Sequence, residues 1–281
     1  MKSKVVSKNN VFKVIFTLIL FIVVATTVLP FLWMISASLK FETDVFSYPI
    51  KWIPDKINAI SNYKEVWSGS YNFALFYWNT IKITVIATIL QVTFSAMAGY
   101  AFAKVEFKFK NSIFICLIGA MMIPDQVILV PRFLLSRWFG LYDTHAIIII
   151  LLSFSVYGMF LMRQSMITIP DALSESAKLD GANHFIIFTR IILPISKPVI
   201  ATLAILKFVW TWNDYQHPLI FLKSRNLYTI QLGIRQFASE SGTFYSLQMA
   251  AAVCAIIPLL IVFLLGQNYI LEGMAAGAVK G

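Results

Sequence analysis

The chain has 281 residues, of which 59% are hydrophobic and only 13% are charged, and its mean hydropathy is +0.77. Soluble domains carry about 25% charged residues, so this composition excludes an ordinary soluble protein and indicates an integral membrane protein. The net charge of +10 does not indicate nucleic-acid binding, because lysines and arginines gather at the ends of apolar runs.

Six apolar stretches are long enough to cross a bilayer as helices, which takes about 20 residues. In chain order they lie at about 12–35, 78–103, 112–131, 145–163, 198–217 and 249–271. The first stretch follows several lysines, as in a signal peptide, but it is too long and no small-residue cleavage site follows it. We therefore expect it to be the first transmembrane helix. Pro124, Pro131 and Gly158 permit kinks in the third and fourth spans.

The distribution of lysine and arginine predicts the orientation of these spans. An even number of spans places both termini on one side. With Lys13 included, 12 of these residues lie in the N-terminal segment, the 104–111 and 163–197 loops and the tail, whereas 9 lie in the 36–77, 132–144 and 218–248 loops. Because basic residues favour the cytoplasmic side, we expect both termini in the cytoplasm.

The loop over 36–77, expected outside the cell, is rich in aromatic residues, which usually lie at the headgroup level. This favours a short interfacial helix around Asn62–Trp67 over a ligand-binding role. Cys116 and Cys254 fall inside apolar runs and are interpreted as small buried hydrophobic residues, not as a disulfide or a metal site.

The polar segment 168–198 predicts two short helices lying at an angle across the cytoplasmic face. Pro170 suits a first helical turn, and residues 172–178 can form two turns. Gly181 can then take the positive φ that ends a helix. A second amphipathic stretch over 183–193 is expected to stop at Pro194, after which Pro198 starts the fifth span. Small alanines at 172 and 177 would allow another surface to approach closely.

The same segment resembles the EAA loop of bacterial ABC-importer permeases, which reads E-A-A-x-x-D-G-A followed by I-x-L-P. The stretch Glu175–Ala182 and the run Ile192-Leu193-Pro194 match it, and the departure is Ser176, where the family usually has alanine. In that family the first short helix is the coupling helix, which inserts into a groove of the ATP-hydrolysing subunit. The resemblance implies a coupling role for Ala172, Glu175, Ser176, Ala177, Asp180, Gly181, Ala182 and Pro194.

Further motifs extend the resemblance over the whole chain. Residues 79–80 and 98–103 look like the second span of binding-protein-dependent permeases, and Trp212-Asn213-Asp214-Tyr215 followed by Pro218-Leu219 resembles a segment of the carbohydrate subgroup. The tail 273–281 is similar to the G-L-T-A-G-A-V-K-G terminus of G-type subunits. The chain is thus identified as a member of the MalG-like permeases of carbohydrate ABC importers.

This resemblance implies an all-α, polytopic type I importer permease, a single transmembrane domain over 1–281 with a cytoplasmic coupling loop at 163–197. It would lie in the cytoplasmic membrane of a bacterium. Its expected partners are an F-type permease subunit, two ATP-binding subunits and an extracellular solute-binding protein. The sequence has no G-x-x-x-x-G-K-[ST] motif, so no cofactor is expected on this chain, and ATP and Mg would belong to the ATP-binding subunits.

The fifth span suggests where a sugar would pass. Trp210 lies about 18 Å along a span that begins near 198, slightly beyond the middle. Trp210, Trp212, Asn213 and Asp214 could offer ring faces and hydrogen-bonding groups to a sugar. The alternative is that both tryptophans serve helix packing and the membrane interface, which the family also favours because the F-type subunit supplies most sugar contacts.

Other functions remain as alternatives. A glycerol-3-phosphate-type importer permease would share the same motifs. A secondary transporter should show two related halves, and no repeat is visible. A membrane enzyme would need a catalytic constellation, but the three histidines, His145, His184 and His217, are scattered without metal spacing and no nucleophile has a base partner at motif spacing. We therefore assign no catalytic and no metal-binding residue.

Overall fold

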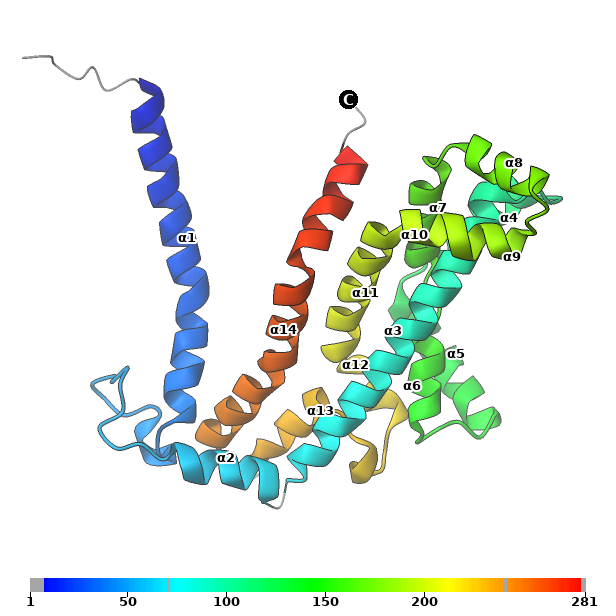
Figure 1. The fold of residues 1–281 in the computed structure, drawn as a ribbon. Helices are drawn as coiled ribbons and strands as arrows, with labels where there is room; N and C mark the ends of the chain where they lie inside the picture. Colours follow the sequence, from blue (N-terminus) through cyan, green and yellow to red (C-terminus); the bar gives the residue numbers. More distant parts are fainter. Residues whose placement is uncertain (1–7, 70, 240–241, 279–281) are drawn as a thin grey trace, which may run out of the picture. The chain divides into compact units, whose positions relative to one another are not determined.

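The computed structural model describes residues 8–69, 71–239 and 242–278, with side chains from Phe12 to Tyr269 within those ranges. The predicted all-α fold is confirmed: helices dominate, and the strands of the described part are β1 (Ala238–Ser239) and β2 (Gly242–Thr243), paired antiparallel. Figure 1 shows the helices in chain order. The last three residues of the tail motif, 279–281, lie outside the described residues. The chain divides into two compact units, over 1–73 with 234–255 and over 74–233 with 256–281.

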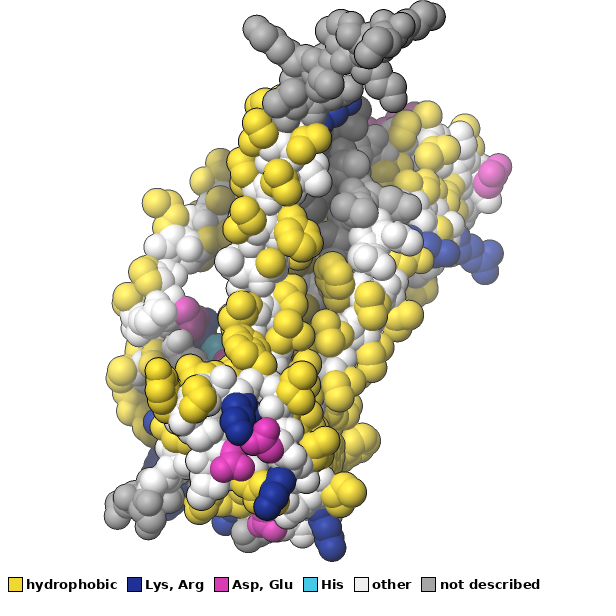
Figure 2. All heavy atoms as spheres, turned by 90° about the vertical axis from the view of Figure 1, so that its left-hand side faces the viewer, with side chains coloured by type: hydrophobic (Ala, Val, Ile, Leu, Met, Phe, Trp, Pro, Cys, Tyr) yellow, Lys and Arg dark blue, Asp and Glu magenta, His cyan; other side chains and the backbone are white. Residues whose placement is uncertain are grey.

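The first unit contains α1 (Lys8–Ser38), a 3-10 turn (Glu42–Asp44), α2 (Ala59–Ser68), a second 3-10 turn (Arg235–Phe237), the β1–β2 pair and the start of α14 (Tyr245–Ala278). Side chains over 12–32 of α1 are exposed, and Figure 2 shows hydrophobic side chains along this helix with charged ones gathered at the loop end. Such a surface suits lipid or another apolar helix.

The loop between α1 and α2 folds back onto the end of α1. Lys40 Nζ donates to Lys51 O at 2.6 Å, and Asn62 Nδ2 donates to Ser38 O at 2.9 Å. Glu42 accepts hydrogen bonds from the amides of Tyr245 and Ser246 at 2.8 Å and so caps α14. The short helix expected around Asn62–Trp67 is present as α2, which begins three residues earlier.

The second unit contains the remaining helices. In chain order they are α3 (Phe73–Lys104), α4 (Lys110–Ala120), α5 (Asp125–Trp138), α6 (His145–Leu152), α7 (Val156–Ile167), α8 (Asp171–Leu179), α9 (His184–Ile187), a π-helical turn (Phe188–Ile192), α10 (Leu193–Ile195), α11 (Lys197–Trp212), α12 (Gln216–Phe221), a 3-10 turn (Arg225–Leu227), α13 (Ile230–Ile234) and the rest of α14.

Two glycines let α3 and α7 approach closely. A Cβ added at Gly99 would lie 2.6 Å from Met162 Cβ, and one added at Gly158 would clash with the side chains of Gln91 and Ser95. Small residues allow such backbone contact in membrane proteins, where packing replaces hydrophobic burial as the source of helix association. Gly158 therefore serves helix contact rather than a kink.

Four described helical segments are long and apolar enough to span a membrane: Phe12–Ser38, Phe73–Lys104, His145–Ile167 and Tyr245–Tyr269. Two bent pairs raise the number to six if each pair is one span: α4 with α5, bent by 97°, and His184–Ile195 with α11, bent by 78°. The expected third span at 112–131 is therefore not one straight helix. Pro124 directly precedes α5 with φ −58° and ψ 138°, and a proline interrupts a helix because its ring fixes φ and it has no amide hydrogen.

The fifth predicted span is also shorter than expected. α11 ends at Trp212, and α12 begins at Gln216, so the stretch 198–217 is interrupted. This break places Asn213 and Asp214 in a turn near the polar groups of neighbouring helices.

Candidate functional site

The predicted coupling segment folds as a helix with a glycine-terminated end. Pro170 precedes α8, and Asp171 is its first residue. At the other end, the amide of Ala182 donates to Ala177 O at 2.9 Å and that of Gly181 to Lys178 O at 3.0 Å. This is the Schellman pattern, and Gly181 has the expected positive φ of 82°. The glycine thus turns the chain sharply from α8 into α9.

α8 presents one face to solvent and one to the protein. Ala172, Glu175, Ser176 and Asp180 are exposed, as is Leu179 at 90%. Ser174 is buried. Ala177 and Ala182 are half-buried and pack against a buried hydrophobic cluster, and the close approach of a partner at Ala177 stays a prediction. Leu179 was not singled out by the sequence argument, although it lies seven residues after Ala172 and thus on the same helix face.

The segment after α8 runs as one continuous helical stretch. The side chain of Asn183 accepts the amide of Ile186 at 2.9 Å and caps α9. The expectation that Pro194 ends this stretch is wrong, because α9, the π-helical turn and α10 run without a break to Ile195. Proline cannot donate to the carbonyl four residues before it, and a wider turn accommodates that loss.

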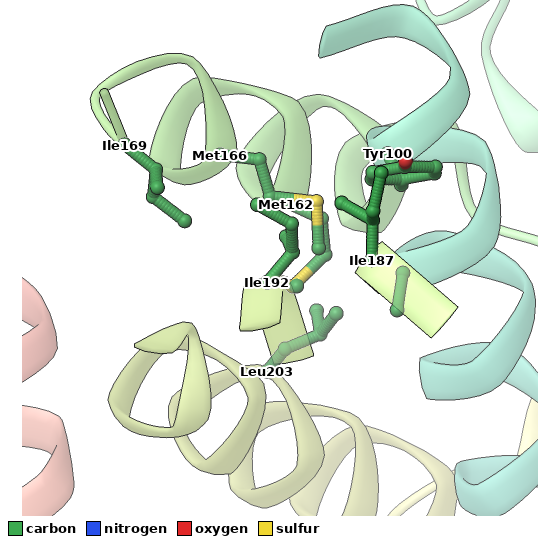
Figure 3. Close-up of a cluster of buried hydrophobic side chains, with 8 residues drawn as sticks. Tyr100, Met162, Met166, Ile169, Ile187, Ile192 and Leu203 are labelled. Carbon is green, nitrogen blue, oxygen red and sulfur yellow. The ribbon is translucent and has the colours of Figure 1, made fainter. Parts of the chain in front are cut away.

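A buried cluster supports the predicted coupling segment (Figure 3). Its members come from α3, α7, the connection to α8, the α9–α10 stretch and α11; they are Ala96, Tyr100, Met162, Met166, Ile169, Ile187, Ile192 and Leu203. The methionines Met162 and Met166 are fully buried at its centre. The cluster therefore connects α8 to α10 with α3, α7 and α11 through close-packed side chains.

Two polar side chains of α3, Lys104 and Tyr100, fix the segment to the end of that helix. Lys104 Nζ donates to Ile169 O at 2.5 Å and to Asp171 Oδ1 at 2.6 Å. The hydrogen bond and positive charge of Lys104 lower the pKa of Asp171. Tyr100 Oη lies 3.0 Å from His184 Nδ1. Sequence reasoning did not find these contacts, since they join residues 67 and 84 positions apart.

A second feature of this unit is a pocket of about 220 Å³, which we call the polar pocket. It is lined by α3, α5, α6, α7, α11, α12 and the connection between α6 and α7. The lining residues are Gln91, Asp125, Arg132, Leu151, Leu152, Phe154, Ser155, Tyr157, Leu203, Leu206, Lys207, Trp210 and His217.

Polar side chains in and beside the polar pocket form two hydrogen-bonded pairs. Arg132 Nη1 binds Asp125 Oδ1 at 2.5 Å. His217 Nδ1 lies 2.9 Å from Asp214 Oδ2, and its Nε2 lies 3.9 Å from Asp125 Oδ2. The sequence argument predicted Asp214 but missed the other three. Asp125 and Arg132 both lie on α5, and His217 reaches Asp125 from α12.

The four residues predicted along the solute path are placed differently. Trp210 lines the polar pocket, is 63% exposed, and lies against Tyr157 with ring centroids 6.2 Å apart. Trp212 is only 1% exposed and packs between the rings of Tyr77 and Phe208. Burial of this kind is typical of a packing residue.

Asn213 and Asp214 form the turn after α11. Asn213 Nδ2 donates to Val209 O at 2.9 Å, and its Oδ1 accepts from Gln231 at 3.3 Å. Asp214 is held by His217. The structure thus places Trp210 in the lining of the polar pocket and Asp214 beside the pocket, where it pairs with His217. Trp212 does not line the pocket. Over the described ranges, no three His, Cys, Asp or Glu side chains converge as metal ligands.

Comparisons with known proteins agree on one family. Residues 91–275 match the family model described as "Binding-protein-dependent transport system inner membrane component". The chain is 30% identical over 273 residues to the arabinooligosaccharides transport system permease protein AraQ of Bacillus subtilis, with 97% of each chain covered. It is 33% identical over 274 residues to the melibiose/raffinose/stachyose import permease protein MelC of the same species, covering 95% of this chain and 96% of MelC.

Among solved structures, the fold resembles a chain of a bacterial ABC transporter involved in the import of the acidic polysaccharide alginate. The TM-score is 0.85 over 96% of this chain and 99% of that chain, at 23% identity. At that identity the likeness establishes the fold alone, and the fold is that of a type I importer permease.

Proposed function

Because the chain belongs to the family of binding-protein-dependent transport system inner-membrane components, we propose that it forms one half of the solute pathway of an ATP-driven sugar importer. The chain is a permease subunit in the inner membrane. AraQ and MelC are named for oligosaccharide transport, which supports a sugar or oligosaccharide as the solute here.

The observation that carries this proposal is the exposed face of α8. This short helix is terminated by Gly181, and its inner face packs against the buried cluster. Its exposed face offers small and flexible side chains to a partner. Leu179, almost fully exposed, would gain most from burial in a groove of another protein. We propose that this face, with Ala172, Glu175 and Ser176, docks into an ATP-binding subunit of the importer.

The complete importer would contain an F-type permease, two ATP-binding subunits and an extracellular solute-binding protein. ATP and Mg would bind to the ATP-binding subunits. Closure of their dimer would move α8, and the buried cluster would pass this displacement to α3, α7 and α11. Trp210 would contact the solute, whereas Trp212, Asn213 and Asp214 would hold the end of α11 in position.

We also propose that both termini and the 163–197 loop face the cytoplasm. Within the second unit, α8 lies at the same end as the C-terminal end of α14 (Figure 1), so a cytoplasmic α8 implies a cytoplasmic C-terminus. The exposed Ser176 provides the test, since the neighbouring Ser174 is buried and would resist labelling on either side. A cysteine at Ser176 should resist an impermeant thiol reagent in intact cells but react in inside-out vesicles. Rapid labelling in intact cells would reverse the proposed orientation.

The function is tested with the assembled importer in proteoliposomes. Sugar uptake should require ATP and the solute-binding protein, and the chain purified alone should hydrolyse no ATP. ATP-independent uptake driven by an ion gradient would identify a secondary transporter instead. ATP hydrolysis by the contaminant-free chain would contradict the assignment of that activity to a partner.

A further inference from the structure

The polar pocket contains one cation without a bonded counter-charge. Both neighbouring carboxylates are engaged, Asp125 by Arg132 and Asp214 by His217. Lys207, on α11, forms no hydrogen bond or ion pair with any residue that the structure describes. Its interaction with Asp214 is electrostatic only, and that carboxylate is already held by His217.

A lysine within a membrane-spanning helix is costly, so such residues normally face a cavity and pair with an opposite charge. Lys207 meets the first condition because it lines the polar pocket. Among the residues that the structure describes, the second condition is unmet, since Asp125 and Asp214 have closer partners. A solute that occupies the pocket and carries a negative charge would meet the second condition.

The rest of the lining suits a sugar ring. Trp210 offers an exposed indole face beside Tyr157. Gln91 is 1% exposed, and its Oε1 has no hydrogen-bond partner, whereas its Nε2 donates to Ser95. The pocket of about 220 Å³ is smaller than most small-molecule sites, which measure roughly 300–1,000 Å³, so it has room for one sugar unit at a time.

We propose that the polar pocket receives a sugar unit that carries an anionic group, with Lys207 Nζ as its counter-ion and Trp210 as its stacking face. This inference rests on the proposed sugar-import function and narrows the solute to an acidic saccharide. A carboxylate, as in a uronic acid, and a phosphate ester offer Lys207 the same charge, so both are tested.

The experiment measures uptake by the complete importer in proteoliposomes, per assembled complex. Four labelled solutes are compared: a neutral oligosaccharide mixture, an acidic mixture from partly hydrolysed pectin, a sugar phosphate and glycerol 3-phosphate. Lys207→Met removes the charge, Lys207→Arg keeps it, and Lys223→Met removes an exposed lysine outside the pocket as a matched control.

We expect the wild type to import an acidic solute, and Lys207→Met to lower that uptake by about tenfold or more, because hydrogen bonds to charged groups are among the stronger ones. Lys207→Arg should retain most uptake, and Lys223→Met all of it. Preference for the carboxylate or the phosphate identifies the anionic group.

Three results would overturn the inference. The wild type could import only the neutral mixture, which would leave the proposed sugar import intact. Lys207→Met could import the acidic solute at the wild-type rate. The Lys207→Met variant could also assemble poorly while its uptake per complex stays normal. That result would indicate that Lys207 pairs with a carboxylate of the partner permease. Absence of ATP-dependent uptake of all four solutes would instead count against the proposed function itself.

Discussion

Lys104 fixes the start of α8, the predicted coupling helix, to α3, and Lys104→Met removes that attachment without changing side-chain length much. The side chain of Lys104 is 4% exposed, whereas that of Asp171 is 75% exposed. The ion pair with such an exposed carboxylate is screened by solvent and adds little. The charged hydrogen bond from Lys104 to Ile169 O is worth about 1.5–3 kcal/mol. A loss of about 2 kcal/mol would raise, by about 30-fold, the equilibrium constant for α8 to move from its packed position to one detached from the protein.

Ser174 reports that equilibrium directly, because it lies on the buried face of α8. A cysteine at Ser174, in a chain whose Cys116 and Cys254 are replaced, should react slowly with a thiol reagent in inside-out vesicles. Lys104→Met should raise its labelling rate by about 30-fold. A cysteine at the exposed Ser176 should react at the same rate in both backgrounds.

Two further variants separate the contributions. Asp171→Asn removes the ion pair but keeps the bond to Ile169 O, so the labelling rate should rise by less than about fivefold. Lys110→Met breaks a pair with Glu106, which is 91% exposed, and should have no measurable effect. An unchanged labelling rate in Lys104→Met, or equal effects of Lys104→Met and Lys110→Met, would refute this account of how α8 is held.

Three other predictions concern the two tryptophans of α11, the exposed face of α8 and the carboxylate of Asp143. Trp212→Ala should cost about 3–5 kcal/mol of stability because its ring is buried, and this loss should appear as a lower melting temperature of the purified complex. Trp210→Ala should leave the melting temperature unchanged and lower sugar uptake per complex several-fold. The opposite result for the two variants would mean that Trp210 packs and Trp212 contacts the solute. Glu175→Lys should leave membrane insertion intact but lower sugar uptake per ATP hydrolysed, and normal coupling would exclude Glu175 from the docking face. Hydrogen bonds from Ser224 lower the pKa of Asp143 below its usual value of about 3.9, so the ionised carboxylate stabilises the fold above that pH, and this stabilisation is lost as the pH falls through the lowered pKa. Asp143→Asn should therefore lower the melting temperature at pH 7 and remove this part of the fall in melting temperature at acid pH. The same dependence of melting temperature on pH in both proteins would contradict this prediction.

The coupling segment shows how far local sequence reaches. The turn at Gly181 was predictable because a Schellman end depends on residues within one turn of the helix. Which face of α8 points inward was not, since that depends on the cluster of Met162 and Met166 beneath it. Pro194 misled for a related reason: its local preference to end a helix is outweighed by the packing of Ile192 and Leu193, and a π-helical turn absorbs the conflict.

The polar pocket could not have been predicted from the sequence by the same reasoning. Asp125, Arg132 and His217 come from two helices far apart in the chain, and the sequence argument assigned no pocket role to any of them. In the structure, Asp125 and Arg132 lie on α5 after the first broken span, and His217 lies on α12 after the second break. Proline at 124 signals the first break, but the direction of a 97° bend is set by tertiary contacts.

α11 connects the predicted coupling segment to the polar pocket. It begins directly after α10, across the 78° bend that follows the coupling segment, and it carries Lys207 and Trp210 toward its other end. From Lys197 to Trp210 the helix rises about 20 Å, so a tilt of about 10° at its base would displace the indole by about 3 Å. That displacement is comparable to the size of a hydrogen bond and is enough to make or break a contact between Lys207 and an anionic group. If α8 rotates on an ATP-binding subunit, as proposed above, the same small rotation would release a solute held at this pocket, without any rearrangement inside α11 itself.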